Sequence, residues 1–242
     1  MRAPPVPARI TFLFFADKAH EMIFATWNVN SGSISSRLSE LRETYPSDVV
    51  ALQETAEPIG DTTCSWAGGR KHKGLSLSTD LPYERVRYEG ETSPCIAARI
   101  AASEIGPFNV LAVWAQPKPT YFADLSRCLD LYAPFIQEAP TVILGDFNMS
   151  VRVHSKGWQF YLLNACLNHD FDLHSAYHEY SGERFGMETM TTLYWRWGAA
   201  GCFHCDFIYI PGVWMPRLKS VAIPGYTKFT TSDHRPVMCE IV

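Results

Sequence analysis

The pattern of apolar and polar residues from position 22 onward predicts a strand, a helix and a second strand. The apolar run 22–27 is typical of a buried strand and leads into a polar turn at 28–32. Apolar residues then recur at helical spacing: Ile34, Leu38, Leu41 and Tyr45. Ser33 can cap the start of this helix and Pro46 can end it. Because a second apolar run follows at 49–52, the pattern predicts a parallel crossover unit.

The rest of the chain is predicted to add more strands and two more helices. Helices are expected at 121–138, where one face is apolar, and at 155–167. Strands are expected at 75–79, 95–101, 108–115, 141–144, 205–210, 217–223 and 236–241. The stretch 56–74 contains several glycines and is expected to be a loop. No repeat or linker divides residues 22–242, so we expect one domain of sheets packed against outer helices, after an extension of uncertain order at 1–21.

The composition fits a protein with a large core and excludes few classes of function. Of 242 residues, 47% are hydrophobic and 19% are charged, which is enough apolar material for a large α/β domain. No run of about 18 consecutive apolar residues is present, so we expect no membrane span. The net charge of −4 gives no global basic field. A nucleic-acid substrate would therefore be held by a local basic strip or a bound metal ion.

The cysteines and the first residues favour a cytoplasmic protein. Seven cysteines are scattered along the chain, and their odd number favours reduced thiols over a disulfide framework. The apolar run 10–16 follows Arg2 and Arg9 and weakly resembles a signal peptide. It is short for that purpose, and Asp17 and Lys18 follow where a small-residue cleavage site is required. We therefore expect a cytoplasmic location.

Four polar clusters stand at the ends of apolar strands or beside them. They are Asn28 after the first strand, Glu54 after the second, Asp146 with Asn148 after the strand at 141–144, and 232–236 before the last strand. Strand ends of a layered α/β protein bring residues that are distant in sequence into one cleft. Carboxylate and amide oxygens suit a hard cation such as Mg²⁺ or Mn²⁺. Each cluster alone has a structural explanation, although Glu54 fits one less readily because a buried carboxylate needs a partner. The four together predict a metal-dependent active site.

Five short motifs resemble the successive signatures of the endonuclease/exonuclease/phosphatase superfamily, which includes deoxyribonuclease I, apurinic endonucleases, sphingomyelinases and inositol-polyphosphate phosphatases. They are Trp27-Asn28-Val29-Asn30, Leu52-Gln53-Glu54-Thr55, Gly145-Asp146-Phe147-Asn148, His204-Cys205-Asp206-Phe207 and Ser232-Asp233-His234-Arg235-Pro236. The resemblance spans residues 22–242 in the family order. It implies an α/β fold, a four-layer α/β sandwich of two packed mixed β-sheets flanked by helices, with the active site at one rim.

The resemblance also implies roles for individual residues. Three residues would hold or border the divalent metal ion: Asn28, Glu54 and Asp233. Asp146 would orient or deprotonate the attacking water, and Asn148 would steady that water and the phosphate. His234, oriented by Asp206, would contact a phosphate oxygen and stabilise charge in the transition state. These roles suit the cleavage of phosphate esters, in which positioning and charge neutralisation supply most of the rate enhancement.

Two positions depart from the family pattern. Relatives often carry Asp two residues after the metal-site Asn, where this chain has Asn30, and the loss of one ligand charge puts a second metal position in question. Many relatives place His or Tyr after the strand at 108–115, where this chain has Trp114. An indole donates one N–H and cannot shuttle a proton, so we exclude Trp114 from catalysis and expect it in the core or in a cleft wall.

Two rival interpretations involve other kinds of function. The segment Cys202-Phe203-His204-Cys205 places three soft ligands within four residues and suggests a zinc module. No second Cys/His pair follows at finger-like spacing, so a strand edge with small thiols is favoured. The second alternative is a catalytically inactive binding protein of the same fold. The retention of the acidic, amide and imidazole residues of the motifs argues against that alternative.

The substrate prediction rests on two groups of cations and aromatic rings. They are Trp66 with Arg70, Lys71 and Lys73, and Tyr194 with Trp195, Arg196 and Trp197. Such residues bind phosphates and stacked bases, although the first group equally fits a solvated loop and the second a core. We expect a nuclease acting on DNA or RNA phosphodiesters. The alternative is a phosphatase or phosphodiesterase for a small-molecule or lipid phosphate, and no protein partner is deducible.

Overall fold

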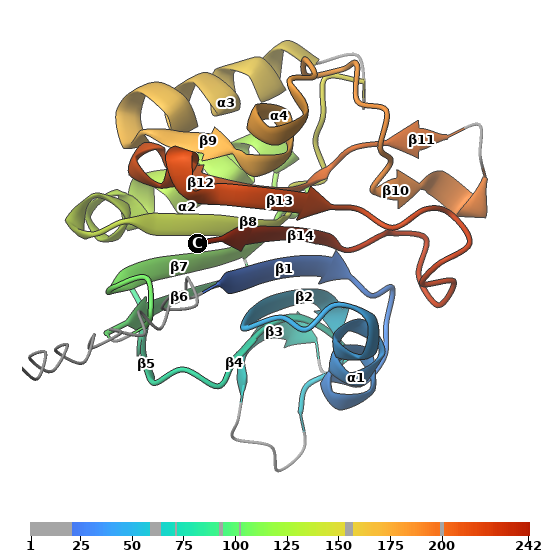
Figure 1. Ribbon diagram of the computed structural model, residues 1–242, viewed down its shortest axis with the longest axis horizontal. Coiled ribbons are helices and arrows are strands. Elements are labelled where there is room, and N and C mark those ends of the chain that lie inside the picture. The colour runs from blue at the N-terminus through green and yellow to red at the C-terminus, as the bar shows by residue number, and fades with distance from the viewer. Residues whose placement is uncertain are drawn as a thin grey trace, which may run out of the picture.

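Two mixed β-sheets pack face to face, and helices cover their outer faces (Figure 1). The coordinates are a computed structural model that describes residues 21–58, 64–70, 72–91, 94–101, 103–152, 157–198 and 201–242. The arrangement confirms the predicted α/β fold with four layers. Apart from Glu21, the expected extension at 1–21 lies outside the described residues.

The first sheet has six strands within the described part of the chain, in the order β13–β14–β1–β2–β4–β3. Their bounds are β1 (Met22–Asn28), β2 (Val49–Thr55), β3 (Cys64–Arg70), β4 (Lys73–Thr79), β13 (Leu218–Ala222) and β14 (Val237–Ile241). Helix α1 (Ile34–Thr44) connects β1 to its parallel neighbour β2, which confirms the predicted crossover unit. Ser33 caps this helix as expected, because its hydroxyl oxygen accepts a hydrogen bond from the backbone N–H of Ser36.

The second sheet also has six described strands, in the order β5–β6–β7–β8–β12–β9. Their bounds are β5 (Tyr83–Val86), β6 (Cys95–Ile100), β7 (Phe108–Trp114), β8 (Thr141–Asp146), β9 (Leu173–Ser175) and β12 (Asp206–Pro211). Helix α2 (Tyr121–Glu138) connects the parallel strands β7 and β8. Helix α3 (Gly157–Phe171), helix α4 (Ala176–Ser181) and the short 3₁₀ segments Trp195–Trp197 and Gly212–Arg217 complete the described helices. The short strands β10 (Leu193–Tyr194) and β11 (Cys202–Phe203) form a separate hairpin.

Three apolar layers separate the sheets and helices. Alternate residues of one strand enter different layers, because side chains of a strand point to opposite faces. In β8, for example, Val142 and Leu144 lie between the two sheets, whereas Ile143 faces α2 and α3. Trp27 and Leu52 form the third layer with α1. Strands buried on both faces explain why the sequence shows continuous apolar runs there.

Several expectations were wrong in detail. Residues 64–70 form the edge strand β3, although 56–74 was expected to be a loop. The glycines of β3 stand where its pairing with β4 shifts register. Glycines in this segment therefore mark an irregular strand and not a loop. The strands β5 and β9 are only 4 and 3 residues long and carry too few residues for a periodic pattern. The helix expected at 155–167 is α3, which extends to Phe171, and residues 155 and 156 lie outside the described part.

No helix in the described ranges has both the length and the apolar character needed to cross a membrane.

Gly145 allows β7 and β8 to approach closely just before the polar end of β8. It has a φ of +156°, and a Cβ atom built there would lie 1.9 Å from the backbone oxygen of Val113. Val113 is the register partner of Gly145 across the parallel pair. Only glycine fits such a contact without moving the backbone.

We expect Gly145→Ala to lower the free energy of unfolding by ~1–3 kcal/mol, because overpacking of a tight site costs about that much. Gly225→Ala is the matched control, since a Cβ atom there would meet nothing within 4 Å. Urea unfolding of both variants measures the difference. Equal stability of the two variants would contradict the close packing of β7 against β8.

Candidate active site

Asn28 links the carboxyl ends of three strands that belong to two different sheets. It is the last residue of β1, and its side-chain amide donates to Glu54 Oε1 at 3.4 Å and to Asp146 Oδ2 at 2.9 Å. Glu54 lies near the end of β2, the parallel neighbour of β1, and Asp146 ends β8 in the second sheet. The hydrogen bond from Asn28 to Asp146 therefore joins the two sheets at one rim.

A bulge brings Glu54 to this rim. In β2, Val50 and Leu52 face α1, so strict alternation would direct Glu54 to the same side. The pairing of β2 with β4 shifts register between Gln53 and Thr55, and Glu54 has a left-handed backbone with a φ of +62°. Bulges commonly re-aim a side chain next to active sites. Here the bulge places the carboxylate of Glu54 beside Asn28.

Asp146 is fully buried and receives hydrogen bonds from a neighbouring turn. The backbone N–H of Asn148 donates to Asp146 Oδ1 at 2.8 Å, and its side-chain amide donates to Oδ2 at 2.9 Å. Asn148 has a φ of +51°, a conformation that Asn adopts more readily than most residues. Burial, and then the charge of Asp206, raise the pKa of Asp146 to about 7, despite the opposing effects of His234 and Asn28.

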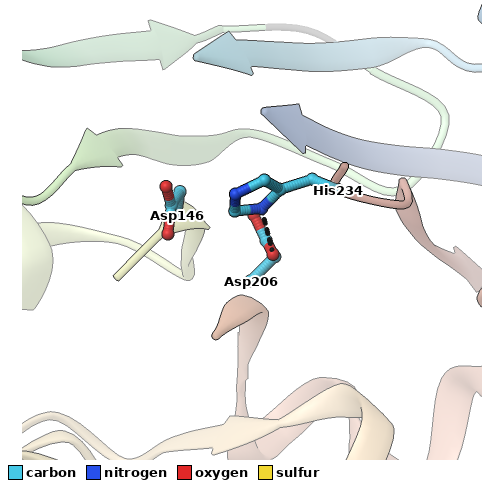
Figure 2. A group of neighbouring side chains, drawn as sticks. All are labelled: Asp146, Asp206 and His234. Atoms are coloured by element: carbon cyan, nitrogen blue, oxygen red, sulfur yellow. Dashed lines mark hydrogen bonds and ion pairs between the residues drawn. The ribbon is translucent and has the colours of Figure 1, made fainter. Parts of the chain in front are cut away.

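Asp206 and His234 form a buried pair beside Asp146. Asp206 begins β12 and is the register partner of Asp146 across the antiparallel pair of β12 and β8. Its Oδ2 lies 2.9 Å from His234 Nδ1, a contact that Figure 2 marks with a dashed line. Its buried Oδ1 has no hydrogen-bond partner among the described residues. Burial opposes the imidazolium form, but the charge and hydrogen bond of Asp206 outweigh that effect and raise the pKa of His234 to about 9. The imidazole is therefore cationic at neutral pH.

The backbone around His234 is fixed by the first strand. Ser232 Oγ donates to the backbone oxygen of Asn28 at 2.7 Å and accepts from the N–H of His234 at 3.0 Å. Trp27 Nε1 donates to the backbone oxygen of His234 at 3.2 Å. The Ser-Asp-His segment is thus tied to the same strand end that carries Asn28.

Asp146, Asp206 and His234 come together as a group that could hold a cation. One ligand atom from each lies within 4.8 Å of the others, and Figure 2 shows the three side chains converging. This set shares no residue with the predicted metal ligands Asn28, Glu54 and Asp233. Because His234 is cationic and already pairs with Asp206, the carboxylate oxygens of Glu54 and Asp146 fit a hard cation better than the imidazole does.

Asp233 lies at the edge of this group. Its side chain is half-buried, and its negative charge contributes to the raised pKa of His234. Its backbone oxygen accepts a hydrogen bond from the N–H of Tyr194 at 2.8 Å. The structure therefore places Asp233 near the site, although it is not a member of the three-residue group.

Two residues of the site were not predicted as site residues. Lys73, at the start of β4, forms an ion pair with Glu54, so both carboxylate oxygens of Glu54 face an N–H donor. The sequence showed Lys73 only as part of a basic stretch. Tyr121 begins α2, and burial followed by the charges of Asp146 and Glu54 raises the pKa of its phenol. A tyrosine at a helix start is an ordinary feature, so no sequence pattern marked it.

Trp114 is a core residue, as expected. It ends β7, is 9% exposed, and packs in the apolar layer between the two sheets.

The zinc interpretation gains no support. His204 is buried, its Nδ1 lies 3.1 Å from the backbone oxygen of Met190, and burial lowers its pKa to about 4. Cys205 is also buried, and burial raises the pKa of its thiol. Cys202 lies in the hairpin strand β11. In the described part of the chain, none of these three residues belongs to a group of three metal-ligating side chains.

The family profile described as Endonuclease/Exonuclease/phosphatase family matches residues 25–234. The chain therefore belongs to this family of phosphoesterase hydrolases, as the motifs predicted. A search of the curated proteins finds no match for the sequence.

Solved structures with the same fold share little sequence with this chain. The 3′ phosphatase NExo from Neisseria, a variant bound to a product DNA hairpin, is 21% identical, with a TM-score of 0.69 over 91% of this chain and 99% of that one. An AP endonuclease from Archaeoglobus fulgidus is 18% identical, with a TM-score of 0.64 over 90% and 98% of the two chains. These similarities establish the fold.

We expect Asp206→Asn to lower the pKa of His234 from about 9. The charge of Asp206 is the largest effect that raises this pKa, and burial, which lowers it, is unchanged in the variant. At about pH 8 the imidazole is then mostly protonated in the parent protein and mostly neutral in the variant. A ¹³C-histidine NMR titration of the metal-free protein measures both values. Asp172→Asn, which changes one of the two acidic neighbours of the partly exposed His174, is the control. An unchanged His234 titration in Asp206→Asn would show that the two groups do not pair.

Proposed function

We propose that the protein is a divalent-metal-dependent phosphodiesterase that cleaves DNA or RNA with the site formed by Asn28, Glu54, Asp146, Asn148, Asp206, Asp233 and His234. The observation that carries the proposal is the convergence of six of these side chains from both sheets and the connecting turns. Asn28, Glu54, Asp146 and Asn148 form one hydrogen-bonded set, and the pair of Asp206 and His234 lies next to its Asp146. Apolar residues would pack better at these buried positions than carboxylates, amides and an imidazole do, so packing does not explain this set.

The residues fit a hard divalent cation. The carboxylates of Glu54 and Asp146 both accept from the side-chain amide of Asn28, so they offer oxygen ligands in one place, as Mg²⁺ and Mn²⁺ prefer. Asn28 Oδ1 accepts from the backbone N–H of Asn30 at 3.0 Å and would add an oxygen ligand on giving up that bond. Asn28 and Glu54 would hold the ion, with Asp233 at its border. Lys73, which pairs with Glu54 in the structure, would then be available to a phosphate oxygen of the substrate. When bound, the ion neutralises charge on the phosphate and lowers the pKa of coordinated water.

The other steps of the reaction are assigned to individual side chains of the site. Asp146 lies at the centre and would orient the attacking water and accept its proton. Asn148, whose amide lies 2.9 Å from Asp146, would hold the same water and a phosphate oxygen. His234, kept cationic by Asp206, would donate to a phosphate oxygen on which charge develops in the transition state. Asp206 fixes the ring orientation through the 2.9 Å contact at Nδ1, which leaves Nε2 to face the substrate.

The choice of nucleic acid as substrate has separate support. The proteins named above as a 3′ phosphatase with a product DNA hairpin and as an AP endonuclease share the fold over nearly their whole length. Lys73 and Arg196 supply cations on or beside the site. A small-molecule or lipid phosphate remains the alternative substrate, and a substrate panel separates the two.

Removal of divalent metal should abolish cleavage, because His234 and Lys73 alone would then have to offset the carboxylates of the site and the anionic phosphate. We expect EDTA to stop cleavage of plasmid, abasic duplex, single-stranded DNA or RNA, and we expect Mg²⁺ or Mn²⁺ to restore it. Sphingomyelin and inositol phosphates complete the panel. Turnover that persists in EDTA, or turnover of a lipid or inositol phosphate alone, would contradict the proposal.

Asp146→Ala and His234→Ala should each lower kcat/KM at least about a hundredfold, the scale of losing a general base or a transition-state donor. His174→Ala is the matched control, because His174 forms a partly exposed ion pair with Asp172. Far-ultraviolet circular dichroism establishes that each variant is folded. Turnover near the parent value in a folded Asp146→Ala or His234→Ala variant would remove that residue from the mechanism.

A further inference from the structure

The hairpin of β10 and β11 presents two tryptophans to solvent beside the active site. We call residues 193–198 and 201–203 the aromatic hairpin; Figure 1 shows its strands beyond the ends of the first sheet, apart from both large sheets. Trp195 is 55% exposed and Trp197 is 44% exposed. Indole rings are normally largely covered in a folded protein, so two exposed rings within three residues mark a binding surface.

Backbone contacts attach the aromatic hairpin directly to the catalytic segment. The N–H of Tyr194 donates to the oxygen of Asp233 at 2.8 Å, and the N–H of Arg235 donates to the oxygen of Thr192 at 2.7 Å. Leu193 and His234 form a β-bridge between these contacts. Trp197 is three residues beyond Tyr194, so their Cα atoms are at most ~11 Å apart. The exposed rings are thus carried only one and three residues beyond the point where the hairpin is bonded to the catalytic segment.

The hairpin is held in place by a buried arginine. The guanidinium of Arg235 lies 4.9 Å from the ring centroid of Tyr194 and 5.4 Å from that of Tyr226. It donates to the backbone oxygens of Tyr226 at 2.6 Å and Ser232 at 2.7 Å. The hydroxyl of Tyr226 donates in turn to the backbone oxygen of Trp197 at 2.9 Å. The exposed rings are therefore carried by a fixed support.

The backbone beneath the rings is strained. Arg196 and Trp197 have φ values of +54° and +60°, in the left-handed region that bulky residues rarely adopt. Strain of this kind persists only where the surrounding structure imposes it, and it is concentrated at functional sites. The guanidinium of Arg196 lies 5.9 Å from the ring of Trp195, which places a cation next to the aromatic faces.

We propose that the aromatic hairpin binds unpaired bases of a nucleic-acid strand, with Trp195 and Trp197 as the stacking surfaces and Arg196 as a phosphate contact. This inference rests on the proposed nuclease function and assigns its substrate class. The net charge of −4 provides little general attraction for phosphates, so stacking has to supply much of the affinity. Inside an intact duplex the base faces are covered by their neighbours. The hairpin therefore selects single strands and frayed ends over duplex interiors.

The test measures binding in EDTA, where the strand is not cleaved. Fluorescence anisotropy compares a labelled single-stranded oligonucleotide, a blunt duplex of the same sequence, and a strand of abasic sugar-phosphate units. We expect the parent protein to bind the single strand most tightly. The variant Trp195→Ala/Trp197→Ala should lose about tenfold or more of that affinity. It should bind the single strand and the abasic strand equally, because the tryptophans act only through the bases.

Two further variants complete the experiment. Trp158→Ala removes a tryptophan that is 58% exposed on α3 and should bind every ligand as the parent protein does. Trp195→Phe/Trp197→Phe should recover most of the lost affinity, since phenylalanine also stacks. The inference is overturned if the double alanine variant binds the single strand as tightly as Trp158→Ala, or if the parent protein prefers the blunt duplex. A binding loss without any Mg²⁺- or Mn²⁺-dependent cleavage would instead overturn the nuclease function and leave the binding surface in place.

Discussion

The active site depends on keeping two carboxylates, Asp146 and Asp206, buried next to each other. They are register partners on β8 and β12, and neither is reached by bulk solvent. Two like charges in such a place repel each other and need compensation. His234 supplies the positive charge, while Asn28 and Asn148 supply hydrogen-bond donors to Asp146. The two carboxylates and these partners come from four different parts of the chain, so the whole fold has to form before the carboxylates are stabilised.

The residues assigned to the chemistry and those assigned to binding stand on different kinds of element, which follows from this constraint. The groups assigned to the chemistry stand on or directly beside strand ends, which both sheets hold rigidly. The exposed aromatic rings and cations stand on short hairpins and turns. Arg235 connects the hairpin to the strand-end residues, because it follows His234 in sequence and packs between Tyr194 and Tyr226. The position of the hairpin is therefore coupled to that of His234.

Much of the fold could be predicted from the sequence, because strands buried on both faces leave continuous apolar runs and α1 carries a clear cap at Ser33. The short strands β5 and β9 could not, since so few residues show no period. The order of the sequence motifs was enough to predict which residues cluster around Asp146. It could not reveal that Glu54 reaches the site only through a bulge, or that Lys73 pairs with it. Both depend on how β2 and β4 pair, which is a property of the assembled sheet.

The pairing of Asp206 with Asp146 has a consequence for how such a protein can change. A slip of β12 by one residue would turn Asp206 toward the layer that Phe207 now occupies, and the carboxylate would leave the site. The segment between the two strands is also constrained, since Asn148 bonds to Asp146, β9 pairs with β12 and α3 packs in the same apolar layer. The aromatic hairpin stands outside both large sheets, so a hairpin of another length would leave the register of β8 and β12 unchanged.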